Sequence, residues 1–224
     1  MFLSNHLIYF LLLFAIAYLL GSANFSIIIS FWIYEKKDIR NLGSKNAGFT
    51  NVLRSIGILP AILTFIGDFL KSILAIYISK LTLNFIKCPN EKICFFLYVI
   101  GFFCFLGHIY PLYFNFKGGK GILTSWAINL LINWKVFLVL FLIYLVLLAI
   151  FRIMSVASLV TAICFPIMVF IFTKSLASSS VALIMVIIIF FKHKSNIKRL
   201  IKKKEKRISI KKKITVAMLF EKNL

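Results

Sequence analysis

Four long stretches of this chain carry no charged side chain, and they constrain its fold more than any other feature. Lys, Arg, Asp and Glu are all missing from residues 1–34, 93–116, 153–173 and 175–191. An uncharged apolar stretch of about 18 residues or more is typical of a membrane-spanning helix. Hydrophobic residues make up 62% of the 224 residues, whereas soluble domains average about 45–50%. The sequence therefore predicts an all-α polytopic membrane protein.

The apolar stretches predict about seven transmembrane helices. We expect them near residues 6–30, 56–79, 93–113, 121–134, 136–151, 154–173 and 177–192. The stretch 121–134 is short, and one helix over 121–151 would be about 46 Å long, well beyond a hydrocarbon core of about 30 Å. Two short helices that fold back at Asn133-Trp134-Lys135 fit better. Five spans, with 121–151 as one tilted or re-entrant helix, is the alternative.

The basic residues predict the orientation of the chain. With the N-terminus outside, the inner loops and the C-terminal tail hold 21 of the 27 Lys and Arg residues and the outer loops hold five. Such a bias places the basic loops in the cytoplasm. We therefore expect a transmembrane domain over 1–192, with cytoplasmic motif loops at 35–54 and 107–121, and a cytoplasmic basic tail over 193–224.

The tail contains the basic clusters Lys202–Lys204, Lys206-Arg207 and Lys211–Lys213. A polybasic segment directly after a span is typical of contact with anionic membrane lipid. Stacking aromatic side chains, which single-strand nucleic-acid-binding modules use, are missing until Phe220. We therefore expect a lipid partner and no nucleic acid. A Lys-rich chain encoded by A/T-rich codons would look similar without any such function.

The glycines indicate where a functional site lies, because seven of the ten flank or fall in the two inner motif loops. Residues 43–54 read Gly-Ser-Lys-Asn-Ala-Gly-Phe-Thr-Asn-Val-Leu-Arg. They combine hydroxyl and amide groups with a glycine-containing backbone, between the guanidinium groups of Arg40 and Arg54 that can hold a phosphate. A solvated connecting loop is the alternative. The candidate site residues here are Ser44, Asn46, Thr50, Asn51 and Arg54.

The second motif loop ends in Lys117-Gly118-Gly119-Lys120-Gly121, directly before an expected span. A helix N-terminus with glycines and lysines is a phosphate site on physical grounds. The P-loop pattern is missing, so a nucleotide is not indicated. The alternative is a tight turn at the membrane edge, with lysines that extend toward water.

Two further motifs are expected on the same side of the membrane. In Arg152-Ile-Met-Ser155-Val-Ala-Ser158, the two serines are three apart and share a helix face, although hydroxyls in spans often bond to their own helix. After the last span, His193 and Asn196 share a face, and Arg199 can join them. A lone histidine at a membrane edge is more often structural than catalytic.

In order and spacing these four motifs resemble the PlsY family of bacterial membrane acyltransferases. The resemblance runs from Gly21 to Ile208, and its third and fourth motifs are Arg-x-x-Ser-x-Ala-Ser and His-x-x-Asn-Ile-x-Arg-Leu-Ile…Glu. It implies transfer of a fatty acyl group from acyl phosphate to the 1-hydroxyl of glycerol 3-phosphate, which gives lysophosphatidic acid and phosphate. This would be the first acylation step of phospholipid biosynthesis, on the cytoplasmic face of the bacterial inner membrane. The chain departs from the family pattern at Ala23-Asn24, Lys45, Phe49, Ser72 and Lys203, where the family has Ile-Pro, Gly, a small residue, Gly and Gly.

The resemblance also implies roles for single residues. Ser44, Arg54, His193 and Asn196 match positions needed for activity, and Glu205 matches one regarded as structural. The proton acceptor is either a substrate phosphate oxygen, which we favour, or His193. Acyl phosphate is reactive without a cofactor, so we expect none, and a soluble enzyme that makes acyl phosphate is a candidate partner. We interpret as substrate-binding Asn46, Thr50, Asn51, Lys117, Gly118, Gly119, Lys120, Gly121, Arg152, Ser155 and Ser158.

Two other functions compete with this interpretation. A transporter of a phosphorylated metabolite could use the intramembrane residues Asp68 and Lys71, which are three apart and could pair. The sequence shows no inverted repeat of the kind that many transporters have. A structural membrane subunit would leave the clustered glycine, serine and lysine motifs unexplained.

Overall fold

The computed structural model describes residues 5–33 and 37–207, and these residues are helical with no strand among them. The predictions for Lys36, for Lys211–Lys213 and for Phe220 lie outside the described residues. Two 3-10 turns, η1 (Ile39–Asn41) and η2 (Leu112–Phe114), lie in the motif loops. The helices are α2 (Leu7–Ser22), α3 (Phe25–Ile33), α4 (Phe49–Ser55), α5 (Ile58–Phe85), α6 (Asn90–Ile109), α7 (Ile122–Ile132), α8 (Trp134–Phe151), α9 (Met154–Thr173), α10 (Leu176–Lys192) and α11 (Lys194–Ile201).

Among the described residues, five helical segments are long and apolar enough to cross a membrane, and a polytopic membrane protein is therefore confirmed. They are Leu7–Trp32, Ile58–Phe85, Asn90–Phe114, Trp134–Phe151 and Met154–Thr173. The pair α10 and α11, bent by 60°, counts as a sixth if it is one span. At about 1.5 Å per residue, the 11 residues of α7 are too short to cross alone. A count of seven spans therefore remains a prediction.

The expected helix break between 121–134 and 136–151 is confirmed. Helix α7 ends at Ile132, and the Asn133 side chain accepts hydrogen bonds from the N–H groups of Lys135 (3.2 Å) and Val136 (3.3 Å). These bonds cap α8, because Asn133 is extended and its side chain serves the first N–H groups of the new helix. Helices α7 and α8 then fold back against each other.

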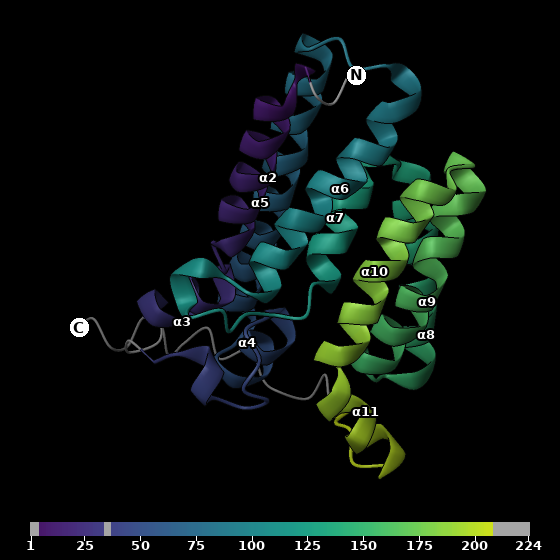
Figure 1. Cartoon of the computed structure of the whole chain (residues 1–224). Helices are drawn as coiled ribbons and strands as arrows, with labels where there is room; N and C mark the ends of the chain where they lie inside the picture. Colours follow the sequence, from purple (N-terminus) through teal and green to yellow (C-terminus); the bar gives the residue numbers. More distant parts are fainter. Residues whose placement is uncertain (1–4, 34–36, 208–224) are drawn as a thin grey trace.

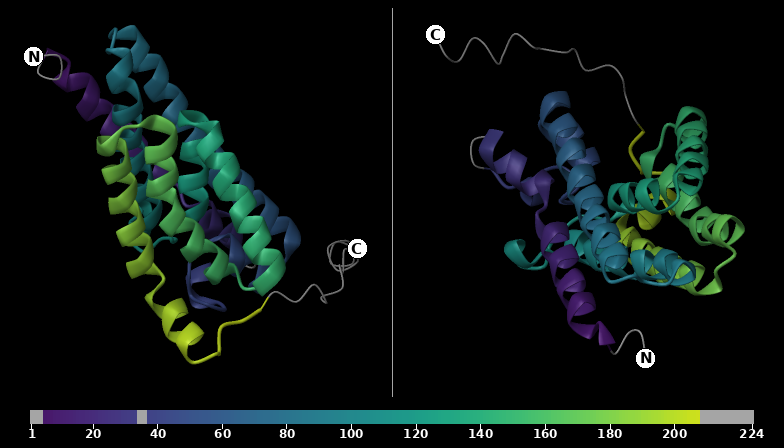
Figure 2. Two further views of the ribbon diagram at one scale, coloured as in Figure 1. Left: turned by 90° about the vertical axis from the view of Figure 1, so that its right-hand side faces the viewer. Right: turned by 90° about the horizontal axis from the view of Figure 1, so that it is seen from above.

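The helices pack in two groups that share α6. Helix α2 packs on α5 and α6, while α9 packs between α8 and α10, and α10 returns to α6 (Figures 1 and 2). Two glycines permit the α2–α6 contact: a Cβ on Gly21 would meet the Cys104 carbonyl oxygen at 2.1 Å, and one on Gly107 would meet the Tyr18 carbonyl oxygen at 2.2 Å. The two helix backbones therefore touch directly, as small residues allow in membrane bundles.

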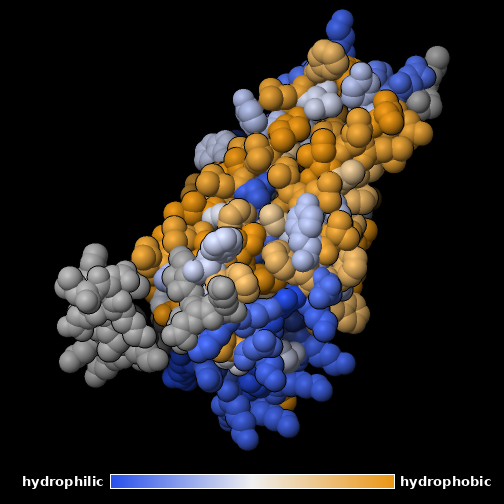
Figure 3. Space-filling model, turned by 90° about the vertical axis from the view of Figure 1, so that its left-hand side faces the viewer, coloured by the Kyte–Doolittle hydropathy of each residue, from blue (hydrophilic) through white to orange (hydrophobic). Residues whose placement is uncertain are grey.

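Apolar side chains cover the outside of the bundle, and polar ones gather at one end. Figure 3 shows a hydrophobic surface along the helices and a hydrophilic end below it. The same end carries α3, α4 and α11, and the N-terminal end of α2 lies at the other (Figures 1 and 2). The motif loops therefore meet at one end of the protein. That this end faces the cytoplasm, with the N-terminus outside, remains a prediction.

Candidate active site

Asn51 organises the first motif loop. It is buried on α4, and its side-chain oxygen accepts the Ser44 N–H at 2.9 Å. Its amide nitrogen donates to carbonyl oxygens of Ile39 (3.1 Å), Leu42 (2.9 Å) and Asn46 (3.0 Å). The sequence predicted Asn51 as a substrate-binding residue, but the structure uses its whole amide group to close the loop, and this holds Ser44 at the exposed surface.

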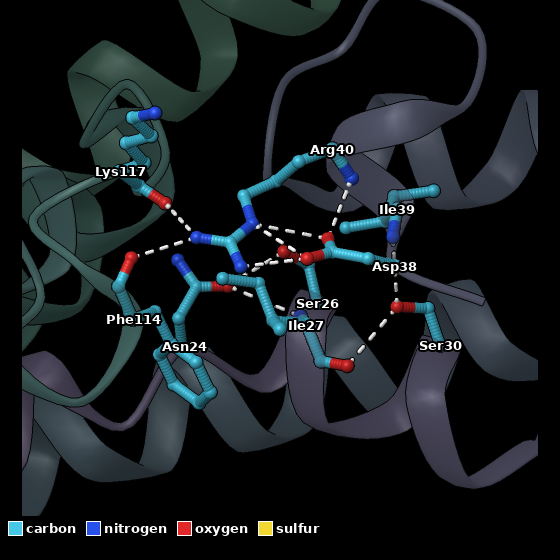
Figure 4. Close-up of polar contacts among 9 residues, drawn as sticks. All are labelled: Asn24, Ser26, Ile27, Ser30, Asp38, Ile39, Arg40, Phe114 and Lys117. Carbon is cyan, nitrogen blue, oxygen red and sulfur yellow. Dashed lines mark hydrogen bonds and ion pairs between the residues drawn. The ribbon is translucent and has the colours of Figure 1, made fainter. Parts of the chain in front are cut away.

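Arg40 connects the first motif loop to the second. Its Nη1 donates to the carbonyl oxygens of Phe114 (2.7 Å) and Lys117 (3.3 Å), and Nε and Nη2 pair with the Asp38 carboxylate at 2.6–3.0 Å (Figure 4). Burial raises the pKa of Asp38, but the bonds and charge of Arg40 outweigh this and lower it. The expectation that Arg40 holds phosphate is therefore wrong for this structure, because its guanidinium is already neutralised and bonded.

The glycine loop is held by its own backbone. The N–H groups of Gly118 and Gly119 donate to the carbonyl oxygens of Ile109 (3.2 Å) and His108 (3.1 Å). These two N–H groups are therefore not available to an anion, contrary to the expected cradle. The loop ends at Gly121, whose φ of +84° favours glycine, and α7 begins at Ile122. The first N–H groups of α7 have no acceptor within their own helix, so they remain the anion-binding part of this motif.

Lys120 joins the second motif to the fourth. Its ammonium donates to the Asn196 side-chain oxygen, and the Asn196 amide donates to Glu205 Oε1 at 2.6 Å. Ser155 of α9 donates to the same oxygen at 2.9 Å, and Arg199 Nε pairs with Glu205 Oε2 at 2.5 Å. Burial raises the pKa of Glu205, but the bonds from Arg199, Asn196 and Ser155 lower it overall. Glu205 thus anchors three motifs in one network.

This network leaves an excess of positive charge. Loss of hydration lowers the pKa of Lys120 to about 8; the charge of Glu205 opposes this fall, and those of Arg199 and Arg54 add to it. Arg54 itself donates from Nη2 to the Lys206 carbonyl oxygen at 3.2 Å. Lys120 and Arg199 both interact with the Glu205 carboxylate, and Arg54 is close enough to lower the pKa of Lys120. Positive charge therefore exceeds negative charge here, which is the charge balance of a site for an anion.

His193 is buried where α10 meets α11. Its Nδ1 lies 2.8 Å from the Ile189 carbonyl oxygen, which can only accept, so Nδ1 carries the proton and Nε2 has a lone pair. Burial, together with the charge of Lys120, lowers the pKa of His193 to about 4, although the bond to Ile189 and the charge of Glu205 oppose the fall. At neutral pH His193 is therefore uncharged and can accept a hydrogen bond at Nε2.

The remaining candidate residues lie around this network. Thr50 donates to the Met154 sulfur at 3.0 Å, which ties α4 to the start of α9. Arg152 caps α8 in a left-handed conformation, with φ of 56°, and its side chain is exposed, as is that of Lys117. Ser158 does not join Ser155 at Glu205; it lines a small cavity between α7, α8, α9 and α10, as Ser125 also does. Asn46 serves the first loop through its carbonyl oxygen.

Sequence reasoning missed His108 as a part of the site. The residue precedes the motif glycines by ten positions, and its carbonyl oxygen and ring both lie against Gly119. The signal was a histidine directly after Gly107 at the end of an apolar stretch. Asp68 and Lys71 were expected to pair, and their ion pair of 2.6 Å confirms this.

Comparison with known proteins identifies the family. A family model described as glycerol-3-phosphate acyltransferase matches residues 11–203. The chain belongs to the glycerol-3-phosphate acyltransferase family. A curated protein of that name from Francisella tularensis subsp. tularensis is 40% identical over 211 residues, 93% of this chain and 97% of the relative. One from Methylococcus capsulatus is 38% identical over 200 residues, 89% of this chain and 96% of the relative.

Two solved structures support the same family assignment. The crystal structure of PlsY, an integral membrane glycerol 3-phosphate acyltransferase, in its glycerol 3-phosphate form has a TM-score of 0.80 and 32% identity, and the match covers 95% of this chain and 99% of that one. The lysophosphatidic acid form has a TM-score of 0.77 and 31% identity, over 90% and 96%. The resemblance to the PlsY family drawn from the motifs is therefore confirmed.

Proposed function

We propose that this acyltransferase moves a fatty acyl group from acyl phosphate to the 1-hydroxyl of glycerol 3-phosphate. The products are 1-acylglycerol 3-phosphate and inorganic phosphate. The observation that carries the proposal is the network of Lys120, Asn196 and Glu205, with Arg54 close to Lys120, at the polar end of an apolar bundle. Such a site suits two phosphorylated substrates, one of which has a long apolar chain.

In this proposal, the cationic residues of the motif loops bind the phosphate groups of the two substrates. Lys120 and the start of α7 would hold the phosphate of glycerol 3-phosphate, with Lys117 at the rim of the same loop. Arg54 would contact the phosphate of the acyl donor, since it lies on α4, the helix that follows the exposed Ser44 in the first motif loop. The Lys206 carbonyl oxygen that Arg54 now contacts is a neutral partner, which a phosphate would replace with a stronger charge-assisted bond.

The reaction itself is an acyl transfer. The 1-hydroxyl oxygen attacks the carbonyl carbon of acyl phosphate, a tetrahedral oxyanion forms, and the bond from carbon to the phosphate oxygen breaks. Ser44 and nearby loop donors would hold the oxyanion, while Arg54 and Lys120 neutralise the leaving phosphate. The mixed anhydride already has a good leaving group, so the proposal needs no metal and no cofactor.

The hydroxyl proton goes to a phosphate oxygen in this proposal. His193 can accept a hydrogen bond from the attacking hydroxyl at Nε2 and so orient it. With a pKa of about 4 in the free enzyme, however, it is a weak base at neutral pH. A phosphate monoester, whose second pKa is about 6, is the stronger base. We therefore assign to His193 an orienting role, and to Asn196 the placement of Lys120.

A direct assay tests the proposed function. Purified protein is incubated with labelled glycerol 3-phosphate and synthetic acyl phosphate, acyl-coenzyme A or acylated carrier protein in parallel. We expect a lipid product from acyl phosphate, retained in Lys87→Met, whose exposed lysine lies far from the site, and lost in Arg54→Gln. A product from a thioester alone would refute the donor. Uptake of label into proteoliposomes without any product would favour the transporter.

We also place the site on the cytoplasmic face of a bacterial inner membrane, where a soluble enzyme can supply acyl phosphate. The motif loops share one end of the bundle, so a single labelling experiment tests the orientation. Single cysteines at the exposed positions Ser44, Lys117 and Ser195, in a cysteine-free background, should all be protected from an impermeant thiol reagent in intact cells. Labelling of any of them from outside would refute this placement.

A further inference from the structure

Three ionisable side chains meet inside the apolar bundle, away from the network around Glu205. Asp68 and Lys71 lie on α5 and His108 on α6, and all three residues are at most 5% exposed. Lys71 Nζ lies 2.6 Å from Asp68 Oδ1 and 3.2 Å from His108 Nδ1, and Asp68 Oδ1 lies 3.7 Å from the same ring nitrogen. Removing two charges from water costs free energy that their attraction seldom recovers in full. Stability alone therefore does not explain why Asp68 and Lys71 are buried here.

The cluster holds the joint between α2 and α3. Lys71 Nζ donates to the Ala23 carbonyl oxygen at 2.8 Å, and the Phe25 N–H donates to Asp68 Oδ1 at 3.2 Å. Ala23 is the C-cap of α2 and Phe25 begins α3, so each charge meets the helix end of opposite partial charge. The cluster therefore fixes where one helix stops and the next starts, just below the motif loops.

His108 extends this cluster to the glycine loop. An ammonium can only donate, so the contact with Lys71 makes Nδ1 the acceptor and places the ring proton on Nε2. Nε2 faces Gly119, where a Cβ would lie 2.1 Å from it and 2.6 Å from the Ala47 carbonyl oxygen of the first loop. The His108 carbonyl oxygen also accepts the Gly119 N–H. Gly119 is thus enclosed by the ring and backbone of His108 and by the first loop.

We infer that Asp68, Lys71 and His108 are positioning residues for glycerol 3-phosphate binding. They fix the glycine loop in place, and Lys120, the next residue after Gly119, then reaches Asn196 at the site. A loop without this support would sample other arrangements, and the substrate would have to select the competent one, which weakens its apparent affinity. The inference rests on the proposed function, because it concerns the glycerol 3-phosphate site.

Two variants test the role while they keep the fold. Asp68→Asn with Lys71→Met removes both charges, which avoids an unpaired buried charge. His108→Asn keeps an acceptor for Lys71 near the place of Nδ1, but it removes the ring that lies against Gly119. The matched control is Ser79→Ala on the same helix, since Ser79 donates only to the Ala75 carbonyl oxygen. The measurements are thermal unfolding, equilibrium dialysis of labelled glycerol 3-phosphate, and KM for both substrates.

We expect both variants to unfold near the wild-type temperature and to bind glycerol 3-phosphate at least about tenfold more weakly, with KM for the acyl donor within about twofold. Ser79→Ala should match the wild type throughout. A folded double variant with wild-type affinity would overturn the inference. Equal losses for both substrates and in kcat would also overturn it, because they would indicate a general structural role.

The same experiment separates this inference from the proposed function. If the wild type binds glycerol 3-phosphate but no donor gives product, the proposed reaction fails, and the dialysis comparison still decides the role of the cluster. If the wild type binds no glycerol 3-phosphate, the proposed function and the inference fall together. Faster thiol labelling of an exposed Lys117→Cys in the double variant would then still show that the cluster holds the loop.

Discussion

The lowered pKa of Lys120 makes a sharp prediction about pH. A lysine with a pKa of about 8 is mostly charged at pH 7 and mostly neutral at pH 9. If its charge holds glycerol 3-phosphate, kcat/KM for that substrate should fall nearly tenfold per pH unit above about pH 8, because kcat/KM reports the free enzyme. If Lys120 had the pKa of an ordinary surface lysine, near 10.4, kcat/KM would stay constant between pH 7 and pH 9.

Two substitutions isolate the effect. Lys120→Met should raise KM for glycerol 3-phosphate by about 10- to 150-fold, the equivalent of about 1.5–3 kcal/mol for a hydrogen bond to a charged group. If the contact is made equally in the ground state and the transition state, kcat changes little. Lys120→Arg keeps a charge that does not titrate below pH 12, so its activity should persist to higher pH without the decline near pH 8.

The neighbours of Lys120 supply an internal check. The carboxylate of Glu205 raises the pKa of Lys120, so Glu205→Gln should move the decline to lower pH. The charge of Arg199 lowers that pKa, so Arg199→Gln should move the decline to higher pH. The assay is initial rate against glycerol 3-phosphate at each pH, with Lys87→Arg as the control. A decline near pH 8 that persists in Lys120→Arg would refute the reasoning.

Three further predictions concern single positions. Gly119→Ala should weaken glycerol 3-phosphate binding in equilibrium dialysis and destabilise the fold by about 1–3 kcal/mol, because the added carbon overlaps the His108 ring. Lys203→Gly should raise the unfolding temperature: φ is 53°, and relief of about 1–2 kcal/mol of left-handed strain exceeds the entropic cost of glycine, about 0.5–1 kcal/mol. His193→Ala should lose mainly affinity in steady-state kinetics and keep an acid limb near pH 6, that of the substrate phosphate. Loss of that limb together with rescue by imidazole would instead identify His193 as the base.

The sequence predicted the positions of most helices because long stretches without charged side chains mark most of the spans. Segment ends were less accurate, and α5 shows why. The predicted span 56–79 stops before Lys80 because a charge was expected to end it, but α5 continues to Phe85. The Lys80 ammonium contacts the Leu131 carbonyl oxygen, one of the last on α7. A lysine within a helix is tolerated when its ammonium binds a free carbonyl oxygen at the end of another helix. Sequence alone does not show that Leu131 supplies this oxygen to Lys80.

The motif glycines illustrate a second limit. A run of glycine and lysine before a helix suggests free N–H groups for an anion, and α7 does begin there. Which N–H groups are free depends on what lies beneath the loop. The carbonyl oxygens of His108 and Ile109 take the bonds of Gly119 and Gly118, because α6 ends directly under them. This pairing joins segments about ten residues apart, and no local pattern in the loop records it.

Arg40 and Arg54 show why residue type could not settle the site. Both are guanidinium groups in the first motif loop, and both were candidates to hold phosphate. Arg40 follows Asp38 by two residues, and the 3-10 turn folds it onto that carboxylate, so its charge is cancelled within its own segment. Arg54 lies a helix away from that carboxylate, and its Nη2 donates to a neutral carbonyl oxygen of the 202–207 segment. The nearest acid therefore decides which arginine can serve an anionic substrate.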